Sequence, residues 1–286
     1  MTDFNMKVLI KKATGVIFLA IVGTATFATC LWIWGAWNDE WSGYNASLSI
    51  SDGYCNIAVL PIVGDITTFD SSTSETETET YPYTNADDVI SLLRQAESDP
   101  YIQGVLARID SPGGYPVSSE IIANAIKNSQ LPSVALIRES GASGGYLVAT
   151  GADTIIASPF SDVGSIGITM SYVENWRQNE SDGLGYVSLS SAPFKDYLDP
   201  NKPLTSEERS LVERDLKIWH EQFVKEVSEN RNLPLEDVAK LADGSSIPGQ
   251  LALENNLIDS LGDQQTARQW FADQLGLSKG EVNFCE

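Results

Sequence analysis

The run GASGG at residues 141–145 places a serine among small residues, shortly after the apolar stretch at residues 134–137. We expect a strand over that stretch and a helix that begins directly after Ser143. A helix N-terminus offers free N–H groups and partial positive charge, which suits a nucleophile beside a developing oxyanion. Serine is also a preferred helix cap, so the local pattern leaves a nucleophile and a plain cap both open.

A serine nucleophile needs a base, and the composition leaves few candidates. The chain holds one histidine, His220, on the edge of the apolar face of a predicted helix. The GxSxG spacing around Ser143 fits the nucleophile elbow of an α/β-hydrolase, in which His220 would be the base. The other choice is a lysine that desolvation or nearby cations keep neutral, and Lys195 and Lys202 are the first two after Ser143.

The two lysines differ in their neighbours. Lys195 follows Ala-Pro-Phe at residues 192–194, which could form an apolar wall, whereas Lys202 lies in a predicted solvated turn. Asp196 would tend to hold the adjacent Lys195 in its charged form. These patterns therefore favour Lys195 only slightly.

A second glycine-rich turn, DSPGG at residues 110–114, follows the apolar stretch at residues 105–109. Two glycines after a proline allow the backbone to approach a ligand closely and leave amide groups free to donate. The spacing of a P-loop is absent, so the turn does not predict phosphate binding.

Composition excludes several classes of function. The 286 residues carry 18 Lys+Arg against 39 Asp+Glu, a net charge of −21, which argues against nucleic acid as a partner. One histidine and three separated cysteines (Cys30, Cys55 and Cys285) predict no metal site, no cofactor and no disulfide framework. An enzyme of this composition would work with hydroxyls, carboxylates, lysines and backbone groups.

Strands and helices alternate along most of the chain. Such alternation indicates βαβ crossovers and a largely parallel α/β sheet, with ligands at the carboxyl ends of its strands. The acidic, Ser/Thr-rich residues 71–80 predict a solvated loop. We expect strands at 57–66, 105–109, 134–137 and 154–157, and helices at 89–96, 121–126 and 205–230.

The N-terminus predicts a membrane anchor. Residues 13–37 contain no charge and are long enough to cross a bilayer as a helix. Lysines precede this segment and acidic residues follow it, which places the N-terminus in the cytoplasm. The sequence thus predicts a cytoplasmic segment at 1–12, a transmembrane helix at 13–37, a linker at 38–55 and an extracytoplasmic domain at 56–286, in a single-pass protein of the cell membrane.

Five motifs in order resemble the signal peptide peptidase family of Ser/Lys proteases over about residues 56–265. The resemblance implies a Clp-protease/crotonase-like core of βαβ units. It also implies a ring-like homo-oligomer in which serine and lysine can come from neighbouring subunits. The motifs are RIDSPGG (108–114), GASGGY (141–146), GSIG (164–167), FKD (194–196) and the segment from ADG (242–244) to residue 262.

Carried over to this sequence, the resemblance implies Ser143 as nucleophile and Lys195 as general base. It implies that the N–H groups of Gly114 and Gly144 form the oxyanion hole, and that Ser165 orients Lys195. The expected function is a membrane-anchored serine endopeptidase that degrades apolar peptides such as cleaved signal peptides. The alternatives are a Ser/Lys membrane protease that cuts a specific membrane-protein partner, an α/β-hydrolase esterase that uses His220, and an anchored scaffold without activity.

Overall fold

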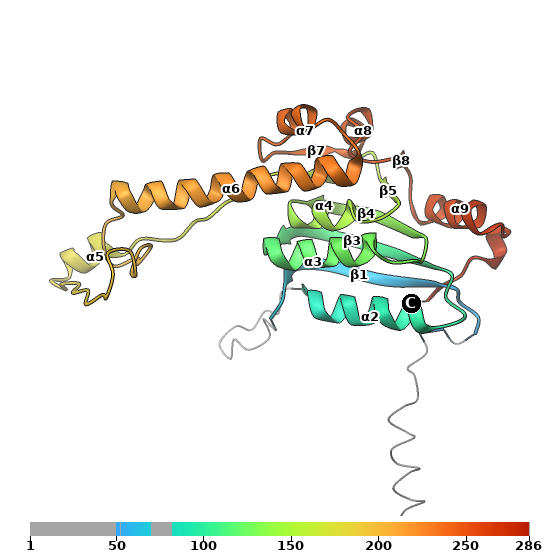
Figure 1. Cartoon of the computed structure of the whole chain (residues 1–286), viewed down its shortest axis with the longest axis horizontal. Coiled ribbons are helices and arrows are strands. Elements are labelled where there is room, and N and C mark those ends of the chain that lie inside the picture. The colour runs from blue at the N-terminus through green and yellow to red at the C-terminus, as the bar shows by residue number, and fades with distance from the viewer. Residues whose placement is uncertain (1–49, 52, 70–81, 286) are drawn as a thin grey trace, which may run out of the picture. The chain divides into compact units, whose positions relative to one another are not determined.

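The computed structural model describes residues 50–51, 53–69 and 82–285. These residues form a mostly parallel β-sheet with helices packed around it (Figure 1). Its strand order is β2-β1-β3-β4-β5-β8, with β6 between β4 and β7, and with β9 beside β1. Among the strands of the described residues, only the β6–β7 pair is antiparallel. The strands are β1 (Ile57–Thr67), β2 (Tyr83–Asn85), β3 (Gly104–Gly114), β4 (Ser133–Ala142), β5 (Thr154–Ala157), β6 (Asp162–Gly164), β7 (Ser246–Pro248), β8 (Ser260–Leu261) and β9 (Phe284–Cys285).

Helices connect the strands and confirm the predicted α/β alternation. Asn85 caps α2 as its side chain accepts the N–H of Asp87 at 2.9 Å, and Thr205 caps α6 in a capping box with Glu208. The helices are α2 (Ala86–Ser98), α3 (Pro116–Lys127), α4 (Gly144–Ala149), α5 (Trp176–Ser181), α6 (Ser206–Arg231), α7 (Leu235–Leu241), α8 (Gly249–Glu254) and α9 (Gln264–Leu275), with a 3-10 turn η2 (Lys279–Glu281).

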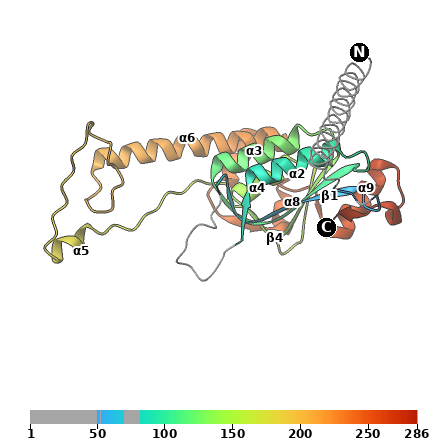
Figure 2. The ribbon, with the colours of Figure 1, turned by 90° about the horizontal axis from the view of Figure 1, so that it is seen from below.

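The sheet is buried on both faces because its central strands alternate apolar side chains between two cores. Along β1, Ala58 and Leu60 enter a core with α2, α3 and α4, whereas Ile57 and Val59 enter a second core against α9. Figure 2 shows α2 and α3 along one side of the sheet and α9 at another edge. Burial on both faces explains why these strands read as continuous apolar runs rather than as alternating ones.

Strands β3 and β4 extend beyond the predicted strands, which ended at residues 109 and 137. Both glycine-rich turns continue the pairing after an irregularity in register between Ile109 and Ser111, so that Ser111 lies opposite Gly141. The hydrophobic pattern did not show this because the added residues are polar or glycine. The extension brings the two turns side by side.

Residues 169–222, which we call the arm, extend away from the sheet (Figure 1). The arm includes the N-terminal part of α6. Glu208 is the single buried residue in this range. The predicted apolar face of α6 is buried at Phe223 and Val227, but Trp219 is 43 % exposed. The amphipathic pattern therefore covers the core only in the C-terminal part of the helix.

A disulfide joins Cys55 to Cys285, with 5.2 Å between their Cα atoms. The prediction that the cysteines provide no disulfide framework is therefore wrong. The two residues are 230 positions apart, and they meet because β9 pairs with the start of β1, with Ala58 opposite Cys285. Sequence spacing gives no sign of such a pairing.

Four predictions fall wholly or mostly on residues that the structure does not describe. They are the cytoplasmic segment at 1–12, the transmembrane helix at 13–37, most of the linker at 38–55 and the acidic loop at 71–80. Within the described ranges, no helix has the length and apolar character needed to cross a bilayer.

Candidate active site

Ser143 lies between the end of β4 and the first residue of α4, where the sequence predicts it. Its backbone has φ 50° and ψ −121°, a conformation that costs free energy for a residue with a side chain. In the described structure its side chain accepts no capping hydrogen bond, so the alternative that Ser143 is a plain cap is wrong. The hydroxyl of Ser143 is therefore not occupied by the helix that it precedes.

The PGG turn of β3 lies directly against this serine. A Cβ atom placed on Gly113 would be 2.8 Å from Cβ of Ser143 and 2.9 Å from the amide nitrogen of Gly144. A Cβ atom on Gly114 would be 2.2 Å from the carbonyl oxygen of Ile66 on β1. Glycine is therefore required at both positions, and a side chain at residue 113 would cover the Gly144 amide.

Gly114 and Gly144, the two predicted oxyanion-hole residues, are brought together by the same contact. A Cβ atom on Gly144 would be 3.4 Å from the amide nitrogen of Gly114. Gly144 is the first residue of α4, where a backbone N–H has no partner within its helix. Two backbone amides next to a serine hydroxyl are the arrangement that stabilises the oxyanion of acyl transfer.

Ser111 holds the PGG turn in place, a role that the sequence analysis did not assign. Its buried hydroxyl donates to the carbonyl oxygen of Gly64 at 2.6 Å and accepts the N–H of Gly113 at 3.1 Å. It thereby joins the turn to β1. A serine two residues before a Gly-Gly pair is a visible signal, but its partner on β1 is not predictable from the motif.

Ser165 lies on the other side of Ser143. The carbonyl oxygen of the preceding residue, Gly164, accepts the N–H of Ser143 at 2.7 Å. The hydroxyl of Ser165 donates to the carbonyl oxygen of Gly244 at 3.0 Å. The structure thus places Ser165 next to Ser143, with its hydroxyl bound to backbone.

Lys195 is not near Ser143 within one chain. It lies in an exposed turn of the arm, next to Asp196, which contacts the N-terminal end of α6 through Lys202 and Glu208. The opposite end of α6 contacts the active-site helix, since Asn230 donates to Thr150, the residue after α4, at 3.0 Å. Glu208 and Asn230 lie about 33 Å apart along α6.

The two other candidate bases are less suitable. Lys202 contacts two carboxylates, and the hydrogen bond to Glu208, followed by that to Asp196, raises the pKa of this lysine, which favours the charged form. His220 lies half-buried in the middle of α6, and no hydrogen bond or ion pair joins it to Ser143 within the described residues. Neither arrangement fits a general base.

In the described part of the chain, no three His, Cys, Asp or Glu side chains are grouped so that they could hold a metal ion.

Comparison with known proteins identifies the family. The model for peptidase family S49 matches residues 125–278. The Synechocystis protein slr0021, a candidate protease by name, is 36 % identical over 196 residues, which cover 68 % of this chain and 70 % of that protein. An Enterococcus faecium protein that bears the name signal peptide peptidase SppA is 30 % identical over 186 residues, 64 % of this chain and 54 % of its own length.

A solved structure of a ClpP1 mutant from Listeria monocytogenes covers 72 % of this chain and 91 % of its own, at 14 % identity and a TM-score of 0.46. This likeness is weak, and the assignment does not depend on it. The S49 match includes Ser143 and Lys195, and the chain belongs to peptidase family S49 as a serine-type peptidase of the signal peptide peptidase kind.

Proposed function

We propose that the chain is a serine endopeptidase with a Ser143/Lys195 dyad that degrades membrane-derived apolar peptides, such as cleaved signal peptides. The observation that carries the proposal is the contact between the strained Ser143 and the Gly113–Gly114 turn. Ser143 attacks the peptide carbonyl, and the amides of Gly114 and Gly144 stabilise the oxyanion. Neutral Lys195 takes the serine proton and gives it to the leaving amine, and water then releases the acyl group.

In this proposal the dyad forms between neighbouring subunits of a homo-oligomer. Its support is the distance between Lys195 and Ser143 within one chain, together with the apolar character of the arm. The arm exposes apolar side chains that a monomer would not leave in water, such as Leu189 at 96 % and Val173 at 80 %. A second copy that covers the arm of the first would bring its own Ser143 towards the Lys195 of that arm.

The same proposal places the catalytic domain outside the cell membrane, anchored by residues 13–37. The Cys55–Cys285 disulfide supports this location, because disulfides persist in oxidising compartments and are rare in the cytosol. An anchor would hold the active site beside the membrane that supplies its apolar peptides. A net charge of −21 fits peptide substrates better than nucleic acid.

The test measures cleavage of a fluorescent apolar peptide by the full chain in detergent. Ser143→Ala and Lys195→Ala should each reduce kcat by at least about 1,000-fold, as expected when nucleophile or base is lost. Ser98→Ala and Lys225→Ala, which change exposed residues of α2 and α6 outside the arm, serve as matched controls and should retain activity.

Full activity in Lys195→Ala would refute the dyad. Labelling by a serine-reactive probe in the wild type, with none in Ser143→Ala, separates the enzyme from an inactive scaffold. Substrates trapped by Ser143→Ala separate broad degradation of peptides from cleavage of one membrane-protein partner.

A further inference from the structure

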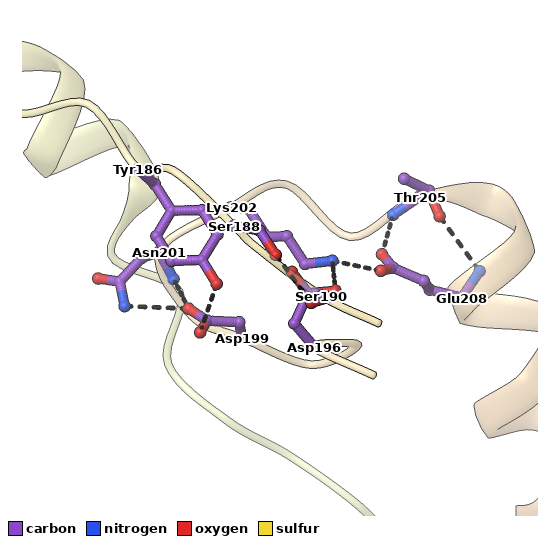
Figure 3. Close-up of polar contacts among 9 residues, drawn as sticks. All are labelled: Tyr186, Ser188, Ser190, Asp196, Asp199, Asn201, Lys202, Thr205 and Glu208. Atoms are coloured by element: carbon purple, nitrogen blue, oxygen red, sulfur yellow. Dashed lines mark hydrogen bonds and ion pairs between the residues drawn. The ribbon is translucent and has the colours of Figure 1, made fainter. Parts of the chain in front are cut away.

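The turn before α6 holds an ion-pair cluster in which Lys202 lies between two carboxylates (Figure 3). Its Nζ is 3.1 Å from Oδ1 of Asp196 and 2.5 Å from Oε1 of Glu208. The Lys202 side chain is 20 % exposed and that of Glu208 is 4 % exposed, so water screens this cluster less than an ordinary surface pair.

Glu208 anchors the cluster to the helix. Its Oε2 accepts the N–H of Thr205 at 3.0 Å, and its own N–H donates to Oγ1 of Thr205 at 3.2 Å. The hydrogen bond from Lys202, followed by the backbone N–H of Thr205, lowers the pKa of Glu208. Glu208 is therefore a fixed negative charge at the start of α6, and it fixes the position of Lys202.

The other end of the cluster is Asp196, the residue after the proposed base. Its carboxylate accepts hydrogen bonds from Ser188 and from Lys202, which in that order lower its pKa. A second carboxylate of the turn, Asp199, is bound separately by the hydroxyl of Tyr186 at 3.0 Å and by Asn201. Lys202 is thus the cation that compensates Asp196.

We propose that Lys202 is a positioning residue for the Ser/Lys reaction. Lys202 ties Asp196 to α6, so that the turn presents Lys195, and it compensates the charge of Asp196. This inference rests on the proposed function. The sequence shows a conflict, because a carboxylate beside a lysine base holds that lysine in its inactive, charged form. The Lys202 contact resolves the conflict, because the Asp196 charge is already paired.

The charge balance gives opposite predictions for two substitutions. Lys202→Met removes the compensating cation and leaves Asp196 and Glu208 unpaired, so the ammonium form of Lys195 is favoured and activity should require a higher pH. Asp196→Asn removes the carboxylate and leaves Lys202 on Glu208, so activity should persist to a lower pH. A role limited to holding the fold together would not move the two variants in opposite directions.

The experiment measures kcat/KM of the full chain on the fluorescent peptide from about pH 6 to about pH 10. In Lys202→Met the acidic limb of the profile should move up by about one pH unit, with kcat lowered and KM little changed. In Asp196→Asn the limb should move down. The double variant should return towards the wild-type limb, and Lys202→Arg should keep the wild-type limb because it retains the charge.

The controls distinguish the possible failures. Lys225→Met, which changes an exposed lysine of the same helix outside the arm, should leave the profile unchanged. A limb that stays in place in both Lys202→Met and Asp196→Asn would overturn the positioning role. If Lys202→Met does not fold, as judged by thermal unfolding, Asp196→Asn alone decides. Full activity in Lys195→Ala would instead refute the proposed function itself.

Discussion

At the scale of single residues, the catalytic centre depends on backbone groups that side chains hold in place. Ser143 has a strained φ and ψ, and the amides beside it come from glycines whose positions allow no Cβ atom. The strain persists only because neighbouring strands fix the backbone on both sides. Ser111 does this for the PGG turn, through one hydrogen bond to β1 and one to Gly113.

Ser111→Ala should therefore lower kcat by about 10-fold and leave KM almost unchanged, because the oxyanion hole loses its alignment. The buried Gly64 carbonyl and Gly113 amide would lose a partner, which should cost about 1 to 3 kcal/mol of stability. Steady-state kinetics and thermal unfolding measure the two effects.

The matched control is Ser133→Ala, which removes another buried serine at the opposite end of β4. Ser133 hydrogen-bonds Asp153, not the active site. It should lose stability but keep kcat. Equal losses of kcat in the two variants would contradict a specific role for Ser111.

At the scale of elements, the two ends of β1 have separate tasks. Its C-terminal end lies against the PGG turn, with Ile66 opposite Gly114. Its N-terminal end pairs with β9, and the Cys55–Cys285 disulfide closes that pairing. Stability and catalysis should therefore respond differently to changes at the two ends.

Cys55→Ser with Cys285→Ser, or reduction of the wild type, should lower stability by about 2 to 5 kcal/mol and Tm by roughly 5 to 15 °C. The loss arises because a cross-link between distant parts of the chain is removed. Peptide cleavage well below Tm should be unchanged, because the bond lies at the opposite end of β1 from the site. Thermal unfolding with and without reductant measures the effect, with Cys30→Ser as control. An unchanged Tm would contradict the bond.

At the scale of the whole molecule, the described unit contains a proposed nucleophile and a proposed base that are too far apart to react with each other. Helix α6 connects them, with its C-terminal part packed on the core and its N-terminal part exposed. The proposed solution is assembly, in which the arm of one subunit reaches the serine of the next.

Inactive variants should therefore complement each other. Co-expression of Ser143→Ala with Lys195→Ala in equal amounts should restore about a quarter of wild-type activity, because a random ring joins an intact serine to a neighbour's intact lysine at about one site in four. Each variant alone should remain inactive. No recovery in assemblies shown to be mixed would mean that both groups come from one chain.

The sequence allowed correct prediction of features that depend on near neighbours. The alternation of strands and helices, and the place of Ser143 between a strand and a helix, follow from short patterns of apolar and small residues. Predictions failed where distant residues meet. The Cys55–Cys285 bond and the Lys202 cluster depend on the path of the chain between elements, which hydrophobic periodicity does not encode.

The length of α6 has a further consequence for how activity begins. Under the proposed assembly, a single chain is inactive until it assembles, because α6 spans about 33 Å between Glu208, which contacts the Lys195 turn, and Asn230, which contacts α4. Activity would then rise more steeply than in proportion to chain concentration, and dilution would switch the enzyme off. The cell could thus regulate proteolysis through the local density of the protein alone.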